Sequence, residues 1–246
     1  MLAEPADQQR LIALADLDAE YARLQHAARS LPQHATIAEQ MKQRQLLVED
    51  LTRATTRADD HTVAVKRAEA DLVPVRARLE REEKRIADGS VSDPKVLRGL
   101  TQEVERIRRR IEELEDAQLE VMGLLETVTA ERDDLASRKA ELEEQVRAEV
   151  AIRDEQVGRL GAEAKAVAAS RSEVAKQLPA PLLALYERLR EHTGLGAAKL
   201  HRGRCGGCQL EITVADLDTY RKAAPNEVLR CSECDRILVR TAESGL

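Results

Sequence analysis

Apolar residues at heptad spacing are the feature that most constrains what this 246-residue chain can fold into. The clearest run alternates intervals of three and four residues through Leu97, Leu100, Val104, Ile107, Ile111 and Leu114. This spacing places one apolar stripe along an α-helix that packs against another helix as a coiled coil. Weaker stripes cover residues 11–31, 48–86 and 121–146. We therefore expect most of the chain to form long helices that each bury a narrow stripe.

The composition agrees with this expectation. The chain has three tyrosines, no phenylalanine and no tryptophan, while charged residues make up 34%. Because aromatic side chains supply much of the area of a thick interior, a conventional globular core is not expected over most of the length. The net charge of −6 argues against coating nucleic acid through overall charge.

A single strong turn divides the helical region. Gly89 can end one helix, and Asp93 with Pro94 can start the next. About 80 residues lie on each side, 8–87 and 95–178, so each arm would be roughly 120 Å long. Equal arms favour an intramolecular antiparallel hairpin over the alternative, a parallel homodimeric coiled coil, and homo-oligomers formed through the coiled coil remain open. Pro32 and Pro74 are expected to interrupt or kink the first arm.

All four cysteines lie in the C-terminal region, in two C-x-x-C pairs separated by 22 residues: Cys205, Cys208, Cys231 and Cys234. Two such pairs supply the four thiolates of a tetrahedral zinc site, and a closed shell of this kind is structural and not catalytic. We predict one structural Zn²⁺ whose binding is coupled to folding. Iron and redox cysteines are the alternatives, although the βαβ setting of a thioredoxin-like site is missing.

These patterns predict a mainly α fold, a long antiparallel coiled-coil hairpin followed by a small C-terminal zinc ribbon with short β-strands and one short helix. The predicted domains are the hairpin at 1–178 with its tip near 88–95, a short helix and joint at 179–198, and the ribbon at 199–246. In the ribbon, "QLEITV" and "RILVR" alternate like strands and Thr213 can cap the helix. We expect the terminal "TAESGL" to fray and the surface around Leu210, Tyr220 and Ile237 to face a partner.

Charge is distributed unevenly along the hairpin. Residues 76–110 carry eleven Lys or Arg against seven Asp or Glu, whereas residues 111–149 carry four against thirteen. The basic tip contains the run "RIRRR", which predicts contacts to phosphates or to an acidic partner through Arg106, Arg108, Arg109 and Arg110. A solvated helix face is an equally good interpretation of this run.

The sequence contains no nucleophile–base arrangement, phosphate-cradling loop or carboxylate pair outside the helical charge pattern, and its five histidines are scattered. We therefore expect no enzymatic activity and no small-molecule substrate. No signal peptide or long apolar segment is present, which predicts a cytoplasmic protein without a membrane partner.

The tip "GSVSDPKVLRGLTQEVERI", the continuation "RIEELEDAQLEVM" and the terminal "CGGC…CSECDRILV" resemble the bacterial C4-type zinc-ribbon family with an N-terminal coiled-coil hairpin, whose members are often labelled predicted nucleic-acid-binding proteins. The resemblance covers essentially the whole chain. It implies that the four cysteines are zinc ligands and that the tip motif comprises Gly89, Asp93, Pro94, Lys95 and Leu97. It implies no enzymatic activity, and some members are linked to chaperone-like or adaptor roles involving RNA, an alternative sigma factor, and flagellar or type III secretion components.

Three functions follow as hypotheses. The first is a non-enzymatic adaptor or chaperone-like protein that bridges macromolecular partners, most of all proteins. The alternative is an RNA- or DNA-binding regulatory protein that contacts phosphates through the basic tip and the ribbon. A weaker third hypothesis is a redox-responsive chaperone that releases zinc on oxidation.

Overall fold

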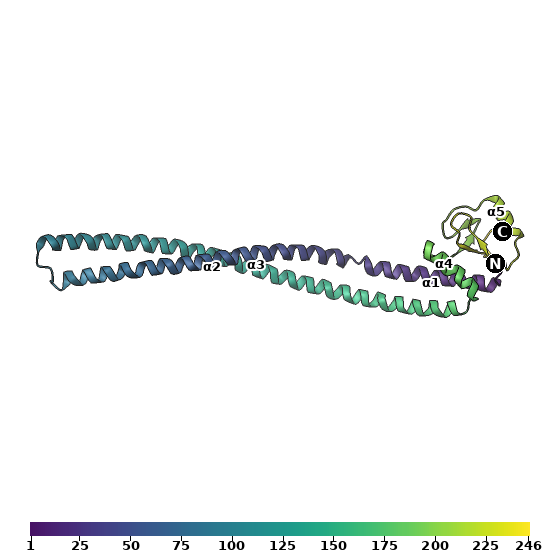
Figure 1. Ribbon diagram of the computed structural model, residues 1–246, viewed down its shortest axis with the longest axis horizontal. Coiled ribbons are helices and arrows are strands. Elements are labelled where there is room, and N and C mark those ends of the chain that lie inside the picture. Colours follow the sequence, from purple (N-terminus) through teal and green to yellow (C-terminus); the bar gives the residue numbers. More distant parts are fainter. The chain divides into compact units, whose positions relative to one another are not determined.

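The computed structural model describes all residues, 1–246, and confirms the predicted fold class (Figure 1). The chain is 76% helical. The helices are α1 (Pro5–Arg29), α2 (Pro32–Ala87), α3 (Pro94–Lys176), α4 (Ala180–Thr193) and α5 (Val214–Lys222), and the strands are β1 (Ala197–His201), β2 (Arg204–Cys205), β3 (Leu229–Arg230) and β4 (Ile237–Val239). The residues form two compact units: unit 1 is Met1–His34 with Ala151–Leu246, and unit 2 is Ala35–Val150.

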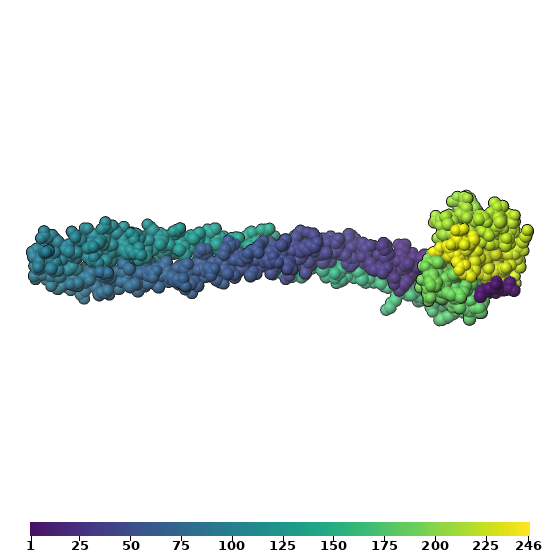
Figure 2. Space-filling view, turned by 45° about the horizontal axis from the view of Figure 1, so that its top comes forward, coloured from purple at the N-terminus to yellow at the C-terminus, as the bar shows by residue number.

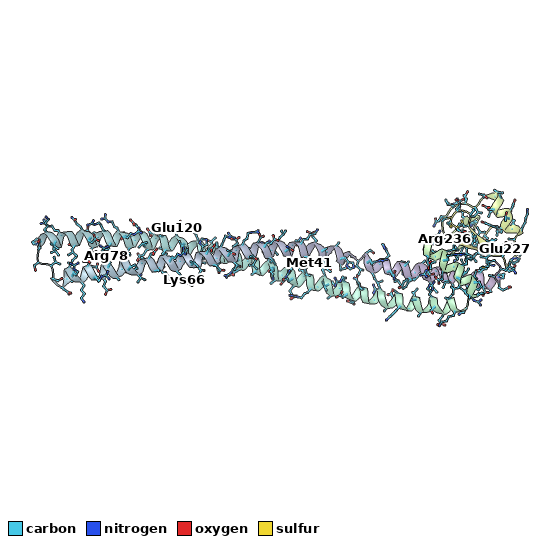
Figure 3. All side chains as sticks on the ribbon, viewed as in Figure 1. Met41, Lys66, Arg78, Glu120, Glu227 and Arg236 are labelled. Carbon is cyan, nitrogen blue, oxygen red and sulfur yellow. The ribbon has the colours of Figure 1, made fainter.

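Unit 2 is the part of the hairpin that contains its turn. Long stretches of α2 and α3 lie side by side here, and most side chains point outward (Figure 3). The buried residues of α3 keep heptad spacing from Val104 through Ile107 and Ile111 to Leu142, while α2 contributes Ala54, Ala58 and Leu72. The core of unit 2 is therefore a narrow seam, partly lined by alanines.

The turn of unit 2 forms as the residues predict. Gly89 has φ 67°, a left-handed conformation that glycine adopts without strain. Asp93 Oδ1 accepts a hydrogen bond of 2.7 Å from the Lys95 amide, and Pro94 is the first residue of α3.

The two prolines of the first arm behave differently. Pro32 is the first residue of α2, so the chain is interrupted between α1 and α2 as expected. Pro74 lies inside α2, which continues without the expected break. Because Pro74 is exposed, the backbone carbonyl that loses its helical partner can bond to water instead.

Unit 1 combines α1, the last part of α3, α4 and a four-stranded sheet with strand order β2-β1-β4-β3. β1 and β4 are parallel, and the two outer pairs are antiparallel. One apolar core joins helices and sheet, because Leu11, Leu14 and Tyr186 pack in the same cluster as Ala197 and Ile237. The ribbon is thus built onto the helices of unit 1.

The chain start also belongs to the ribbon. Leu2 forms an antiparallel bridge with Glu227, and the Ala3 amide donates to the Asn226 carbonyl at 2.7 Å. The first residues, purple in Figure 2, lie against the yellow-green C-terminal region. The sequence patterns did not predict this pairing.

Two local expectations for the ribbon were wrong. "QLEITV" forms no strand and makes only an isolated bridge between Glu211 and Arg204. The terminal "TAESGL" is not frayed, because Ser244 is 3% exposed and donates its hydroxyl to the Leu200 carbonyl at 3.0 Å. The hydrogen bond of Ser244 joins residues 44 positions apart and holds the terminal segment against β1. None of the helices is both long and apolar enough to cross a membrane.

Candidate metal centre and hairpin tip

The four cysteine sulfurs converge at one point of the ribbon. All four Sγ atoms lie within 4.8 Å of one another. The Sγ atoms of Cys205 and Cys234 are 3.8 Å apart, as are those of Cys208 and Cys231. Four sulfurs bound tetrahedrally to zinc at 2.3 Å would be about 3.8 Å apart. The thiols therefore fit one zinc ion, and each of these close pairs joins one C-x-x-C unit to the other.

The two C-x-x-C units have the same backbone geometry. In the first, the Gln209 amide donates to the Cys205 carbonyl at 2.8 Å, and in the second the Asp235 amide donates to the Cys231 carbonyl at 3.0 Å. Gln209 and Asp235 both have positive φ, 63° and 62°. Each unit is thus a tight turn that directs two sulfurs to the same side, the arrangement expected of a zinc knuckle.

The glycines of the first knuckle allow a close approach to β1. A Cβ on Gly206 would lie 2.9 Å from the Lys199 carbonyl oxygen, and one on Gly207 would lie 2.7 Å from Arg236 Cδ. The Gly207 amide points at Cys205 Sγ, at 3.4 Å. These positions exclude larger residues and supply a hydrogen-bond donor to a sulfur.

The thiols differ in acidity. Burial raises the pKa of Cys231 to about 12, although the Cys234 and Glu233 amides act in the opposite direction. Burial acts on Cys234 as well, but hydrogen bonds from the backbone and side chain of Arg236 lower its pKa to about 7. Zinc displaces protons from such thiols, so affinity should rise with pH.

Around the metal cluster, the ribbon is held by residues with clear roles. Thr213 caps α5 as predicted, because its side chain accepts a hydrogen bond from the Asp216 amide. The Arg240 guanidinium donates to carbonyls at the end of α5, including those of Tyr220 and Ala223, both at 3.2 Å. No sequence pattern pointed to Arg240.

The partner-facing surface expected around Leu210, Tyr220 and Ile237 needs correction. Tyr220 is 8% exposed, with its hydroxyl bonded to the Arg230 carbonyl, and Ile237 is fully buried. Leu210 is 52% exposed, and Val214, at the start of α5, is 76% exposed. The apolar surface of the ribbon therefore centres on Leu210 and Val214.

A buried ionic cluster holds the helices of unit 1 together. The Asp18 carboxylate of α1, 2% exposed, accepts hydrogen bonds of 2.6 Å from the Tyr186 hydroxyl and from Arg171 Nε. Arg190 Nε lies 3.2 Å from the same carboxylate, and Glu187 bridges the two arginines. Burial and the hydrogen bond to Asp18 raise the pKa of Tyr186. The sequence offered one signal for this cluster. Asp18 is a carboxylate four residues after Leu14, at a position where the apolar stripe of α1 calls for an apolar residue.

The tip arginines have different ion-pair partners. Arg106 lies 3.4 Å from Glu103, Arg108 lies 2.6 Å from Glu83 of α2, and Arg110 lies 2.8 Å from Glu113. Arg109 makes no ion pair. Whether any of them contacts a partner stays a prediction.

An antiparallel helical hairpin that carries a four-cysteine ribbon defines the class of this protein. The sequence model of the CT398-like coiled coil hairpin domain matches residues 14–194, and that of the C4-type zinc ribbon domain matches residues 204–238. The chain therefore belongs to the family of CT398-like coiled-coil hairpin proteins with a C4 zinc ribbon, as the sequence resemblance implied. The cofactor of this class is one structural zinc, which the convergent cysteines fit.

Relatives share this organisation over their full length. "Uncharacterized protein Rv2229c" of Mycobacterium tuberculosis is 34% identical over 244 residues, 98% of each chain. A solved structure from Mycobacterium smegmatis is 30% identical with a TM-score of 0.87, covering 98% of this chain and 100% of that one. The structure of CT398 from Chlamydia trachomatis, 17% identical, has a TM-score of 0.69 over 96% of this chain and 98% of its own, and shows the likeness of fold alone.

Proposed function

We propose that this protein is a non-enzymatic, cytoplasmic adaptor with a chaperone-like role, whose zinc ribbon presents a binding surface for a protein partner. The observation that carries the proposal is the shared core of unit 1, in which Ile237 and Val239 of the ribbon pack in one cluster with Leu11 and Tyr186 of the helices. A ribbon built in this way is a fixed platform and not a tethered module. A partner bound there is held in a defined orientation to α1 and α4.

The ribbon surface supports a protein partner. Leu210 and Val214 are large exposed apolar side chains close to the first knuckle, and apolar anchors of this kind dominate protein interfaces. From residue 199 onward the chain carries eight basic and seven acidic side chains, so no electrostatic attraction for nucleic acid is expected. The one aromatic residue of the ribbon, Tyr220, is buried and is not available for base stacking.

Binding of RNA or DNA is the second candidate function. The excess of arginine and lysine in residues 76–110 favours it, because Lys and Arg contacts to phosphates supply most non-specific nucleic-acid affinity. Affinity that falls steeply with salt would be its signature.

The adaptor proposal is tested by site-specific photo-crosslinking in cells. A crosslinking amino acid replaces Leu210, and the matched control carries it at Val63, which is 48% exposed on α2. We expect the crosslinking residue at position 210 to form protein adducts that the one at position 63 does not form. The combined variant Leu210→Ser with Val214→Ser should no longer bind these proteins, and its zinc content should be unchanged. Affinity purification of this protein, followed by a second affinity purification of the crosslinked partner, should recover a further protein, because an adaptor bridges two partners. Adducts made mainly of nucleic acid, or the same adducts at both positions, would contradict the proposal.

A further inference from the structure

The two flanks of the hairpin near its turn can be told apart by their ion pairs. If the buried Leu72 and Val104 are heptad position a, Arg78 and Glu103 both occupy position g, and their ion pair of 2.7 Å crosses the seam on one flank. Arg108 and Glu83, 2.6 Å apart, both occupy position e, as do Arg76 and Glu115, so these pairs lie on the opposite flank.

The flanks carry opposite charge. In residues 78–85 and 103–110, the g and c positions hold five arginines and one glutamate: Arg78, Arg81, Arg85, Arg106, Arg110 and Glu103. We call this set the arginine flank. The b and e positions of the same two stretches hold three glutamates and one arginine: Glu80, Glu83, Glu105 and Arg108. The run "RIRRR" is therefore divided, because Arg106 and Arg110 belong to the arginine flank, Arg108 faces the other way and Arg109 occupies the outer f position.

The positive charge of the arginine flank is exposed and only partly neutralised. The side chains of Arg78 and Arg106 are 57% and 63% exposed. These two arginines share one carboxylate, that of Glu103, at 2.7 and 3.4 Å. Arg85 and Arg110 each pair with a carboxylate of their own helix, Glu82 at 2.7 Å and Glu113 at 2.8 Å, and Arg81 makes no ion pair. Fork-shaped guanidinium groups with unused donors are suited to bind further carboxylates or phosphates.

The surroundings limit the length of the anion. Leu72 and Ile111 pack in one cluster, which places Arg110 beside Leu72, so the arginine flank extends from there to Arg85, about 20 Å along the helix. Beyond it, residues 111–149 carry thirteen acidic and four basic side chains and would repel a polyanion that continued along α3. Unit 2 contains no aromatic residue on which unpaired bases could stack.

We infer that the arginine flank is a docking surface for a short acidic segment of a protein partner, of about four helical turns. The inference deepens the proposed adaptor role by assigning a partner chemistry to the hairpin tip. A nucleic acid strand is disfavoured because it carries charge along its whole length and would meet the acidic part of α3.

Fluorescence anisotropy on the full-length, zinc-loaded protein tests the inference. The probe is a labelled 13-residue helical peptide with glutamates spaced at i and i+4, and the same peptide with glutamines is its control. We expect saturable binding of the glutamate peptide alone, weakened by added salt. Combining Arg81→Gln, Arg106→Gln and Arg110→Gln should raise its Kd about tenfold, because three exposed ion pairs of modest strength are lost.

The matched control combines Arg76→Gln, Arg108→Gln and Arg109→Gln, which removes the same charge from the same zone but from other faces, and we expect a change in Kd of less than about threefold. Circular dichroism checks that both variants keep their helices. Equal weakening by both variants, or no saturable binding up to about 1 mM peptide, overturns the inference. It is also overturned if single-stranded RNA binds the arginine flank more tightly than the peptide, or if the arginines act only in self-association measured by sedimentation. Crosslinking at Leu210 uses none of these arginines, so failure here and failure of the adaptor proposal can be distinguished.

Discussion

Unit 1 and unit 2 contain parts of the same long helices but are stabilised in different ways. In unit 2 the seam between α2 and α3 is the only core, and small residues such as Ala54 and Ala58 fill part of it. In unit 1 the helices also pack against a sheet, a buried carboxylate and a metal-binding cluster. The difference indicates that stability is spread thinly along unit 2 and concentrated at a few sites in unit 1.

Loss of the metal should produce the largest effect and confine it to unit 1. Cys231→Ser should abolish stoichiometric zinc binding and unfold the ribbon, because structural zinc contributes an apparent ~10–16 kcal/mol to the folding of such modules. Metal analysis and amide NMR spectra of the ribbon measure this, with Ser232→Ala in the same knuckle as control. A ribbon that kept dispersed resonances without metal would show that its core with α1 and α4 is sufficient.

Breaking the ionic cluster should have the next largest effect. Asp18→Ala leaves the Tyr186 hydroxyl without its acceptor and Arg171 with Glu187 as its one remaining carboxylate, and the loss of one partner of a buried ion pair costs about 3–5 kcal/mol. Hydrogen exchange should show faster opening of α1 and α4 and no change in unit 2. The control is Asp16→Ala at an exposed position. Equal destabilisation by the two variants would show that the ionic cluster does not stabilise unit 1.

Cutting back the seam of unit 2 should be moderately destabilising. Leu72 is 2% exposed and packs on Ile107 and Ile111, so Leu72→Ala should lower the free energy of unfolding by about 3 kcal/mol. Leu46→Ala, at a position 61% exposed on α2, should change it by less than about 0.5 kcal/mol. Urea denaturation gives both values, and similar values for the two would contradict the heptad frame of α2.

High pH should produce the smallest effect and act on unit 1. The folded-state pKa of Tyr186 is raised above its ordinary value of 10.0 by burial and by the hydrogen bond to Asp18. The resulting stability is fully present below pH 10 and is lost above it, where the unfolded tyrosine ionises, by up to about 1.4 kcal/mol per pH unit. Urea titrations between pH 9 and 11 should show this slope in the wild type, and Tyr186→Phe should reduce it to the part contributed by Tyr220, whose pKa burial also raises. An unchanged slope in the variant would assign it to other groups.

Much of the architecture could be predicted because its signals are local. Heptad spacing, the turn at Gly89 to Pro94 and the two C-x-x-C pairs each depend on residues that are neighbours in the sequence. The Asp18–Tyr186 hydrogen bond, by contrast, joins residues 168 positions apart. The pairing of Leu2 with Glu227 and the contacts of Arg240 also depend on distant segments. No periodicity or spacing rule encodes such pairs.

For the charged residues near the turn, too, the sequence and the tertiary structure determine different properties. The sequence by itself determined that basic residues are in excess near the turn, because composition does not depend on packing. Only the tertiary structure decided that Arg106 joins Arg78 and Arg81 on one flank while Arg108 faces Glu83 on the other. Which residues share a face depends on the register between α2 and α3, and that register is set by the seam through Leu72 and Ile111. The sequence likewise determined the four thiols, whereas the platform that carries them arises where the ribbon, α1 and α4 bury one common core.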